Sequence, residues 1–540
     1  MSARWHLALL AGLAIPLLFF GLGATALTDR DEGANAEAAR EMLERQSRII
    51  PTLNYAPRFA KPALVYWLMA GFYATLGVSE TAARLPSALA TAGLVGLQYG
   101  FARWALGARG GLRAALILLL SLEVVALGRM ALTDATLVLW TTAAGFAFFR
   151  AHEGDPPRGR WYAAMGAAIG LGMLTKGPVA LLVPLLGILA YLVVAGGWRR
   201  LWREARLGWL IALFLLVAAP WYAAMLWQHG SEYAARARAQ TLGRVLRTVT
   251  GPGGTVLFYV PVVLIGFFPW SALLPGALVT ALRGARARVT GGRPGAVTVF
   301  AAVWILAGLA VFSLFQSRLP HYVAPLFPPA ALLVAATWPS RVPALSRSLL
   351  AALGLAAGSA LIVARLLGTR LTTLLAPAYP AASDATLPAA VFVVAALALA
   401  TGAAAIFRDG ARLFVVLAAL TAALLAVGFH VALPQFSDAY VAPAAHLVRQ
   451  AAAAARPCDE LVVLGPYRPS LVFYARRPVT FARLADVDAL DGLTQRSGRL
   501  FLLVPRAGLD RLPPALAALA SVEARGGYVL LASAGTGRPC

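Results

Sequence analysis

The sequence has little charge and few cysteines. Only 13% of its 540 residues are charged, and the mean hydropathy of +0.73 is too high for a water-soluble globular protein. The two cysteines, Cys458 and Cys540, leave one possible disulfide, which an oxidising compartment would permit. No Walker loop and no dinucleotide-binding fingerprint stands where a strand, turn and helix could hold it, so neither type of nucleotide site is predicted.

Acidic residues are also few, with 23 Asp and Glu against 47 Lys and Arg and a net charge of +24. Such an excess can indicate nucleic-acid binding, but here the arginines recur in clusters between apolar runs. By the positive-inside rule these clusters mark cytoplasmic loops. With Arg4 in the cytoplasm, the alternation predicts about thirteen membrane spans and an external C-terminal end. The clusters are 103, 109 and 113; 150, 158 and 160; 199, 200, 203 and 206; 283, 286, 288 and 293; 341 and 347; 408 and 412.

Long apolar runs such as 207–228 and 296–315 have the length that crosses about 30 Å of hydrocarbon. The first run, 1–27, lacks a convincing cleavage site and is interpreted as a retained helix. The run 63–76 does not fit the alternation as a full span, so we expect a juxtamembrane or re-entrant helix there. External loops are predicted at about 28–62, with a helix at 33–45, and at about 229–255.

From about residue 434 onward the sequence alternates short apolar segments with Gly, Pro and Arg. Segments 461–464, 500–504 and 528–531 have the length and composition of strands. The sequence therefore predicts an all-α polytopic membrane domain, 1–433, followed by a small external α/β domain, 434–540.

Lysine is almost absent, because only Lys61 and Lys176 occur among the 47 cationic residues. Both fall on the predicted external side. A compact, flexible ammonium differs from a planar guanidinium and binds phosphate as a point charge. The alternative is that the two lysines are retained by chance as interfacial anchors.

Other ionisable residues also lie at external helix ends, where they could line one wet cavity. Asp31, Glu32 and Asp134 are candidates for acid or base chemistry, although each could simply cap a helix. Arg318 and His321 are candidates for substrate binding or for interfacial anchoring. The remaining histidines show no metal-ligand spacing.

Nine short segments resemble, in order, the loop motifs of membrane glycosyltransferases that use lipid-linked sugars. This family includes lipid A aminoarabinose transferases and protein O-mannosyltransferases, and the resemblance covers about the first 340 residues. The segments are DRDE (29–32), EAAREM (37–42), FAKPALVYW (59–67), ARLPS (83–87), LTD (132–134), LTKGP (174–178), PWY (220–222), GFFPW (266–270) and SRLPHYVAP (317–325).

The resemblance implies a C-type glycosyltransferase fold with an extracytoplasmic active site and a polyprenyl (undecaprenyl) phosphate sugar donor. By position, Asp31 matches the catalytic aspartate, Asp134 the second acidic residue and Lys61 the lysine at the lipid phosphate. Arg244, Arg318 and Tyr322 are further candidates for the donor phosphate, and Glu32, Lys176 and His321 for other substrate contacts. The chain departs from the family pattern at Ala34, Asn35, Ala60 and Gln240. Because Gln240 stands where a histidine or asparagine is common in the family, no metal cofactor is predicted.

The resulting hypothesis is a metal-independent, inverting transfer in the bacterial inner membrane, with the active site facing the periplasm. The leading acceptor is lipid A, receiving aminoarabinose or a similar sugar. Protein O-mannosylation is the alternative within the family, and a lipid-linked-sugar flippase is the alternative of another class. A flippase would predict discontinuous helices or inverted repeats at the membrane midplane.

Overall fold

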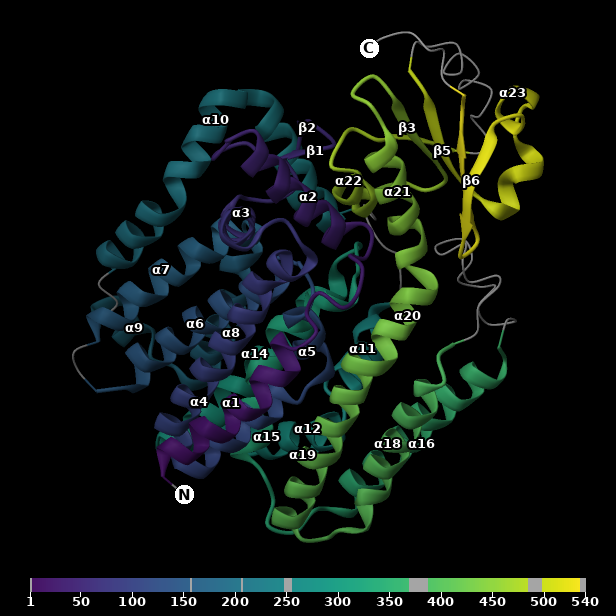
Figure 1. The fold of residues 1–540 in the computed structure, drawn as a ribbon. Helices are drawn as coiled ribbons and strands as arrows, with labels where there is room; N and C mark the ends of the chain where they lie inside the picture. The colour runs from purple at the N-terminus through teal and green to yellow at the C-terminus, as the bar shows by residue number, and fades with distance from the viewer. Residues whose placement is uncertain are drawn as a thin grey trace.

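The computed structural model describes residues 2–155, 158–204, 207–246, 255–368, 387–483 and 498–534. Its helices form an elongated bundle, and a small mixed α/β unit lies at the end opposite the N-terminus (Figure 1). The predicted mostly helical membrane fold with a C-terminal sheet is thus present in outline.

The first part of the bundle contains α1, the first-loop elements α2, β1 and β2, and the helices α3 to α5. The first loop holds α2 and a short antiparallel hairpin, β1 with β2, and α2 agrees with the helix expected at 33–45. Helix α3 has only 13 residues, about 20 Å at 1.5 Å per residue, which suits the expected juxtamembrane position. The bounds are α1 Ala3–Phe19, α2 Asp31–Glu44, β1 Thr52–Leu53, β2 Ala56–Pro57, α3 Leu64–Leu76, α4 Glu80–Leu119 and α5 Leu122–Gly128.

The central helices α6 to α10 pack mainly through the pairs α6 with α7 and α7 with α10. Helix α10 breaks at Gly230, whose φ of 45° and ψ of −121° are not helical, and it then continues to Leu246. Residues 231–246 are thus helical within the external loop predicted at about 229–255, because the charged Ala- and Arg-rich sequence there retains good helix formers. The external position of this segment stays a prediction. The bounds are α6 Asp134–Glu153, α7 Gly159–Lys176, α8 Val179–Ala195, α9 Trp198–Glu204 and α10 Leu207–Leu246.

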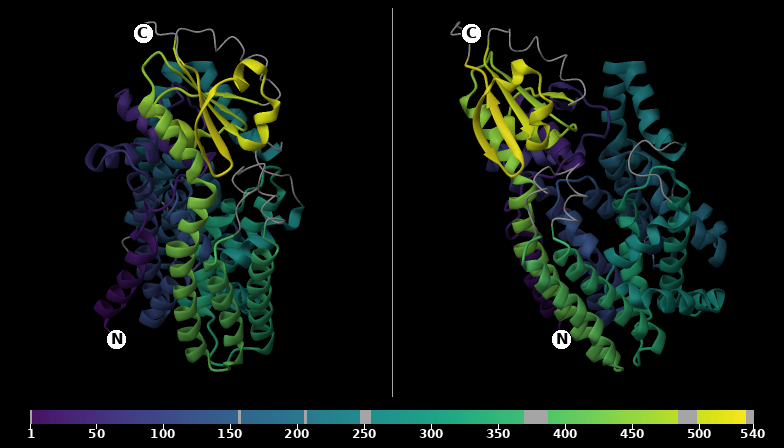
Figure 2. Two further views of the ribbon diagram at one scale, coloured as in Figure 1. Left: turned by 45° about the vertical axis from the view of Figure 1, so that its right-hand side comes forward. Right: turned by 90° about the vertical axis from the view of Figure 1, so that its right-hand side faces the viewer.

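The remaining bundle helices include two long hydrophobic ones, α14 and α16, and a run from α19 to α21 that follows the side of the bundle up to the sheet (Figure 2). Asp409 caps α19 by accepting a hydrogen bond from the backbone N–H of Arg412 at 2.8 Å. The bounds are α11 Tyr259–Gly266, α12 Leu274–Leu282, α13 Ala285–Thr290, α14 Arg293–Leu314, the 3₁₀ segment η3 Pro320–Leu326, α15 Phe327–Ala336, α16 Ala344–Leu366, α18 Ala390–Ala403, α19 Gly410–Val427, α20 Leu433–Tyr440 and α21 Ala442–Ala454.

Within the described residues, four helices are long and apolar enough to cross a membrane, or six if each of two bent pairs is one span. The bent pairs are α4 with α5, at 66°, and the segment 256–266 with 270–282, at 116°. Five shorter apolar helices accompany them. The chain is a polytopic membrane protein, and the count of thirteen spans stays a prediction.

The C-terminal unit is a five-stranded sheet in the order β4-β3-β5-β7-β6. Strands β4, β3 and β5 are parallel, whereas β7 and β6 add to β5 as antiparallel neighbours. The three strands expected from the sequence are β3, β5 and β7. The bounds are β3 Glu460–Leu464, α22 Pro469–Ala475, β4 Thr480–Ala482, β5 Leu500–Pro505, α23 Pro514–Ala517, β6 Ala520–Arg525 and β7 Tyr528–Ala532. Cys458 is disulfide-bonded, and Cys540 lies outside the described residues.

The sheet unit packs closely on the first loop. One apolar cluster joins Ala36 and Ala39 of α2 to Leu447 of α21 and Val472 of α22. The contact is tightest at Gly33, where an added Cβ would come within 2.5 Å of backbone atoms of Ser470. The C-terminal unit and the first loop therefore share a core.

We predict that Gly33→Ala destabilises the protein by about 1 to 3 kcal/mol, because the methyl group must displace backbone atoms in a packed core. The matched control is Gly71→Ala in α3, where an added Cβ meets no atom within 4 Å. That control is expected to be neutral or stabilising by up to about 1 kcal/mol, since alanine is the better helix former. Thermal unfolding in detergent compares the two variants, and equal midpoints would contradict the close packing.

Candidate functional site

The first half of the site lies where α2 begins and where the first loop ends. Asp31 is the first residue of α2, and its carboxylate accepts a hydrogen bond from the Lys61 ammonium at 3.2 Å. The Lys61 side chain is only 6% exposed, whereas that of Asp31 is 39% exposed. A buried cation thus meets a carboxylate that remains accessible to a substrate.

The second half lies between two bundle helices that pack side by side. Asp134 begins α6 and Lys176 ends α7, so the pair joins the N-terminus of α6 to the C-terminus of α7. Their side chains form an ion pair of 2.6 Å. The ammonium of Lys176 also lies 5.1 Å from the centre of the Tyr322 ring, within the range of a cation–π contact.

The two pairs belong to one cluster. Asp31 interacts electrostatically with both Lys61 and Lys176, and Lys61 interacts with both Asp31 and Asp134. His321 lies within electrostatic range of all four of these residues. We call Asp31, Lys61, Asp134, Lys176 and His321 the carboxylate–lysine cluster. It unites residues from five separate segments.

Asp31 and Lys61 each stabilise the charged form of the other. Lys61 is the main reason why the pKa of Asp31 lies well below its usual range, with Lys176 adding to the effect against the cost of burial. Burial lowers the pKa of Lys61, and Asp31 opposes this change. Asp31 is therefore a carboxylate at neutral pH, available as a hydrogen-bond acceptor or as a base.

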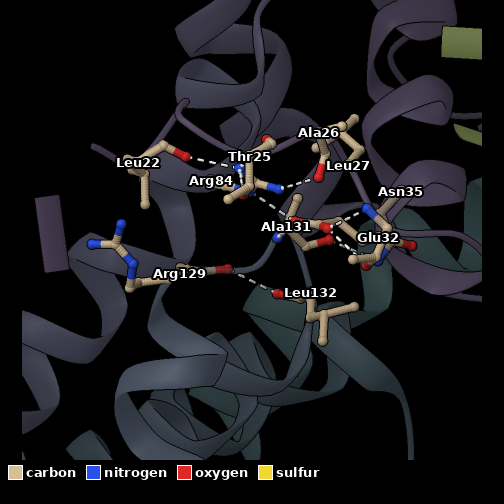
Figure 3. Close-up of polar contacts among 12 residues, drawn as sticks. Leu22, Thr25, Ala26, Leu27, Glu32, Asn35, Arg84, Arg129, Ala131 and Leu132 are labelled. Atoms are coloured by element: carbon tan, nitrogen blue, oxygen red, sulfur yellow. Dashed lines mark hydrogen bonds and ion pairs between the residues drawn. The ribbon is translucent and has the colours of Figure 1, made fainter. Parts of the chain in front are cut away.

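Glu32 does not join the cluster, although it was a candidate for substrate binding. Its side chain is 1% exposed and forms an ion pair of 2.8 Å with Arg84 of α4. The same carboxylate accepts hydrogen bonds from the backbone N–H groups of Thr28, at 2.7 Å, and Ala131, at 2.9 Å. Figure 3 shows this network, in which Arg84 also donates to backbone carbonyls of residues 22, 25 and 26. These contacts favour a structural role, in which Glu32 fixes α2 to the loop before Asp134.

The other predicted phosphate contacts have different outcomes. Arg318 is 5% exposed and donates to the carbonyl of Ser313 at 2.9 Å, but its Nε has no hydrogen-bond partner among the described residues. Tyr322 lies at the cluster through its contact with Lys176. The side chains of Arg244 and Gln240 are outside the described part of the chain. Within that part, no group of three or more His, Cys, Asp and Glu side chains could hold a metal ion.

Sequence reasoning missed Arg58, which precedes Lys61 by three residues. Its Nε donates to the Tyr66 hydroxyl at 3.3 Å, and the guanidinium interacts electrostatically with Asp31 and Lys61. Arg58 also lines a cavity of about 290 Å³, together with Phe59, Ala60 and Arg236. Its position beside Lys61 in the chain was the available signal.

The chain is similar to known proteins in sequence and in fold. Residues 60–223, which include Lys61, Asp134 and Lys176, match the family described as dolichyl-phosphate-mannose-protein mannosyltransferase. The fold is similar to that of ArnT from Cupriavidus metallidurans solved with undecaprenyl phosphate, with a TM-score of 0.81, 23% identity and 98% of each chain covered. An oligosaccharyltransferase from Archaeoglobus fulgidus is more distant, with a TM-score of 0.52, 12% identity and coverage of 94% of this chain and 70% of that one.

These findings confirm the resemblance to membrane glycosyltransferases that use lipid-linked sugars, which the loop motifs indicated. Among the relatives are two proteins named undecaprenyl phosphate-alpha-4-amino-4-deoxy-L-arabinose arabinosyl transferase. That of Edwardsiella ictaluri is 32% identical over 56% of this chain, and that of Pectobacterium carotovorum is 32% identical over 62% of it. The matches cover 54% and 60% of those relatives' own lengths.

We predict that Arg84→Met destabilises the protein by about 3 to 5 kcal/mol at neutral pH, because the buried Glu32 carboxylate loses its paired cation. Chemical or thermal unfolding in detergent measures the loss. Arg236→Met is the control, since its ion pair with Glu232 is exposed and should contribute less than about 1 kcal/mol. Equal losses in the two variants would contradict the structural role of Glu32.

Proposed function

We propose that this protein transfers a sugar from a polyprenyl phosphate donor to an acceptor on the extracytoplasmic side of the bacterial inner membrane. The carboxylate–lysine cluster is the observation that carries this proposal, because it combines a cationic site for phosphate with an accessible ionised carboxylate. The names of the arabinosyl transferase relatives support undecaprenyl phosphate as the lipid carrier and aminoarabinose as the sugar. Lipid A is the proposed acceptor on the resemblance of the loop motifs.

Lys61 is proposed to hold the donor phosphate. When the bond to the anomeric carbon breaks, the phosphate leaves as an anion, so positive charge helps more than a proton does. Lys61 is buried, and low-dielectric surroundings strengthen its attraction for an anion. Arg58 lies beside it, and Arg244, Arg318 and Tyr322 remain further candidates for this role.

Asp31 is proposed to orient or deprotonate the acceptor. Its carboxylate is accessible and ionised, so it can orient a nucleophile or remove a proton from it. A lipid A phosphate is already nucleophilic and needs only positioning, whereas a hydroxyl acceptor needs a base. Attack opposite the departing phosphate inverts the anomeric configuration. Asp134, with Lys176 and His321, would complete the substrate-binding surface.

Two alternatives rest on particular observations. The family match over residues 60–223 favours protein O-mannosylation as the second activity. The bent helix pairs give some support to a lipid-linked-sugar flippase, for which discontinuous helices are expected. A flippase, however, gives no role to a carboxylate paired with each lysine, and it releases no sugar from its donor.

We predict that Asp31→Asn lowers the turnover of sugar from a polyprenyl phosphate donor by about 100-fold or more, the size of a lost acid–base group, while donor binding persists. Lys61→Met should instead weaken binding of the donor phosphate. Purified protein in detergent allows both to be measured, as sugar release and as direct binding of undecaprenyl phosphate.

The matched control for Asp31→Asn is Asp155→Asn, because Asp155 is 89% exposed and pairs with Arg293 away from the cluster. It should retain wild-type turnover. Equal release rates for Asp31→Asn and the wild type would remove the catalytic role of Asp31. No sugar release by the wild type would remove the enzyme hypothesis in favour of transport.

We predict that cells containing the protein carry a lipid A species whose mass exceeds that of the deletion strain by one sugar residue. Mass spectrometry of extracted lipid A tests this, and complementation with Lys61→Met should not restore the species. An unchanged lipid A profile would move the acceptor to proteins or to another glycan.

A further inference from the structure

The turn that presents Asp31 is held in an unfavourable backbone conformation. Arg30, which precedes α2, has a φ of 65°, a region that residues other than glycine seldom adopt. It also makes no side-chain hydrogen bond to cap the helix. The turn therefore depends on contacts made by its neighbours, Thr28 and Asp29.

Asp29 is bound by two side chains of the C-terminal unit. The Nε of Arg468 lies 2.6 Å from one carboxylate oxygen of Asp29, and the hydroxyl of Ser470 donates to the other. The Arg468 side chain is only 5% exposed, so this ion pair is well shielded from solvent. We call Asp29, Arg468 and Ser470 the loop clamp.

The clamp is anchored on both sides. Arg468 also donates to the hydroxyl of Tyr528 on β7, which is buried in the core shared by the sheet and the first loop. Ser470 belongs to α22, which packs against Gly33 of α2 without room for a Cβ. A continuous path of contacts thus leads from the sheet to the turn that carries Asp31.

We propose that the loop clamp positions Asp31 for catalysis, so that the C-terminal unit acts as a rigid support for the active-site turn. Asp29, Arg468 and Ser470 are positioning residues, since they act through Asp31 and not on the substrate. The proposal rests on the proposed function for its effect on turnover, but the orientation of Asp31 can be measured without any activity.

Asp29→Asn, Arg468→Gln and the double variant should each lower sugar-transfer turnover by about 10- to 100-fold, because small displacements of a reacting group are costly, with undecaprenyl phosphate binding retained. The double variant should be no slower than the slower single variant, since both single changes break the same Asp29–Arg468 ion pair. Ser470→Ala keeps that ion pair and removes only the hydroxyl donor, so it should give a smaller loss in the same direction.

Glu80→Gln is the matched control. Glu80 forms an ion pair of 2.6 Å with Arg449, so the change also converts an acid to its amide and breaks a pair with the C-terminal unit. It lies away from the Asp31 turn and should leave turnover unchanged. A loss in Glu80→Gln equal to that in Asp29→Asn would overturn the proposal, because general docking would then explain both.

Carbodiimide labelling of Asp31, followed by mass spectrometry across a pH series, gives the readout that needs no activity. Lys61 holds the pKa of Asp31 low, so a misplaced carboxylate should label with a midpoint about one pH unit higher or more. The shift is expected in both clamp variants and not in Glu80→Gln. An unchanged midpoint in Arg468→Gln would overturn the positioning role. A wild type that labels as expected but transfers no sugar would instead remove the proposed function.

Discussion

The structure depends on placing a lysine ammonium in a buried position, where the Lys61 side chain is only 6% exposed. Burial of a cation is costly unless a partner neutralises it, and Asp31 meets this need for Lys61 at 3.2 Å. Asp134 meets it for Lys176 at 2.6 Å. Each pair joins two different segments, so the four charges hold together the first loop, α6 and α7 as well as defining the site.

A second set of buried charges, the ion pair between Glu32 and Arg84, orients the carboxylate–lysine cluster. Glu32 follows Asp31 directly, and successive side chains on a helix diverge by about 100°. One carboxylate therefore faces the cluster, while the next enters the network with Arg84 and the backbone of Ala131. Glu32 follows Asp31 and binds the backbone of Ala131, and the segment 131–133 leads to Asp134. Glu32 therefore helps to fix Asp31 and Asp134 relative to each other. The loop clamp constrains the same turn through Asp29.

The sequence was sufficient to predict those features that depend on local pattern. The scarcity of lysine indicated Lys61 and Lys176, which lie in one cluster in the structure. Their common external side, which the arginine alternation indicates, stays a prediction. The adjacent acids Asp31 and Glu32 could not be separated, because their different roles arise from helix geometry and from Arg84, 52 residues away. The clamp between Asp29 and Arg468 spans 439 residues, and no local periodicity encodes such a contact. Strand β6 was missed because it is largely exposed and lacks an apolar face.

The pairing of each lysine also has a consequence for any anion that enters the site. A phosphate that approaches Lys61 must compete with Asp31 for the same ammonium, and Arg58 supplies neighbouring positive charge that lessens this competition. The negative phosphate partly neutralises the charge of Lys61. The attraction that keeps the pKa of Asp31 low then becomes weaker, and this pKa rises. Under the proposed function, the carboxylate is then most basic when the donor is bound. The ion pair between Asp31 and Lys61 would thereby make the basicity of Asp31 depend on whether the donor is bound.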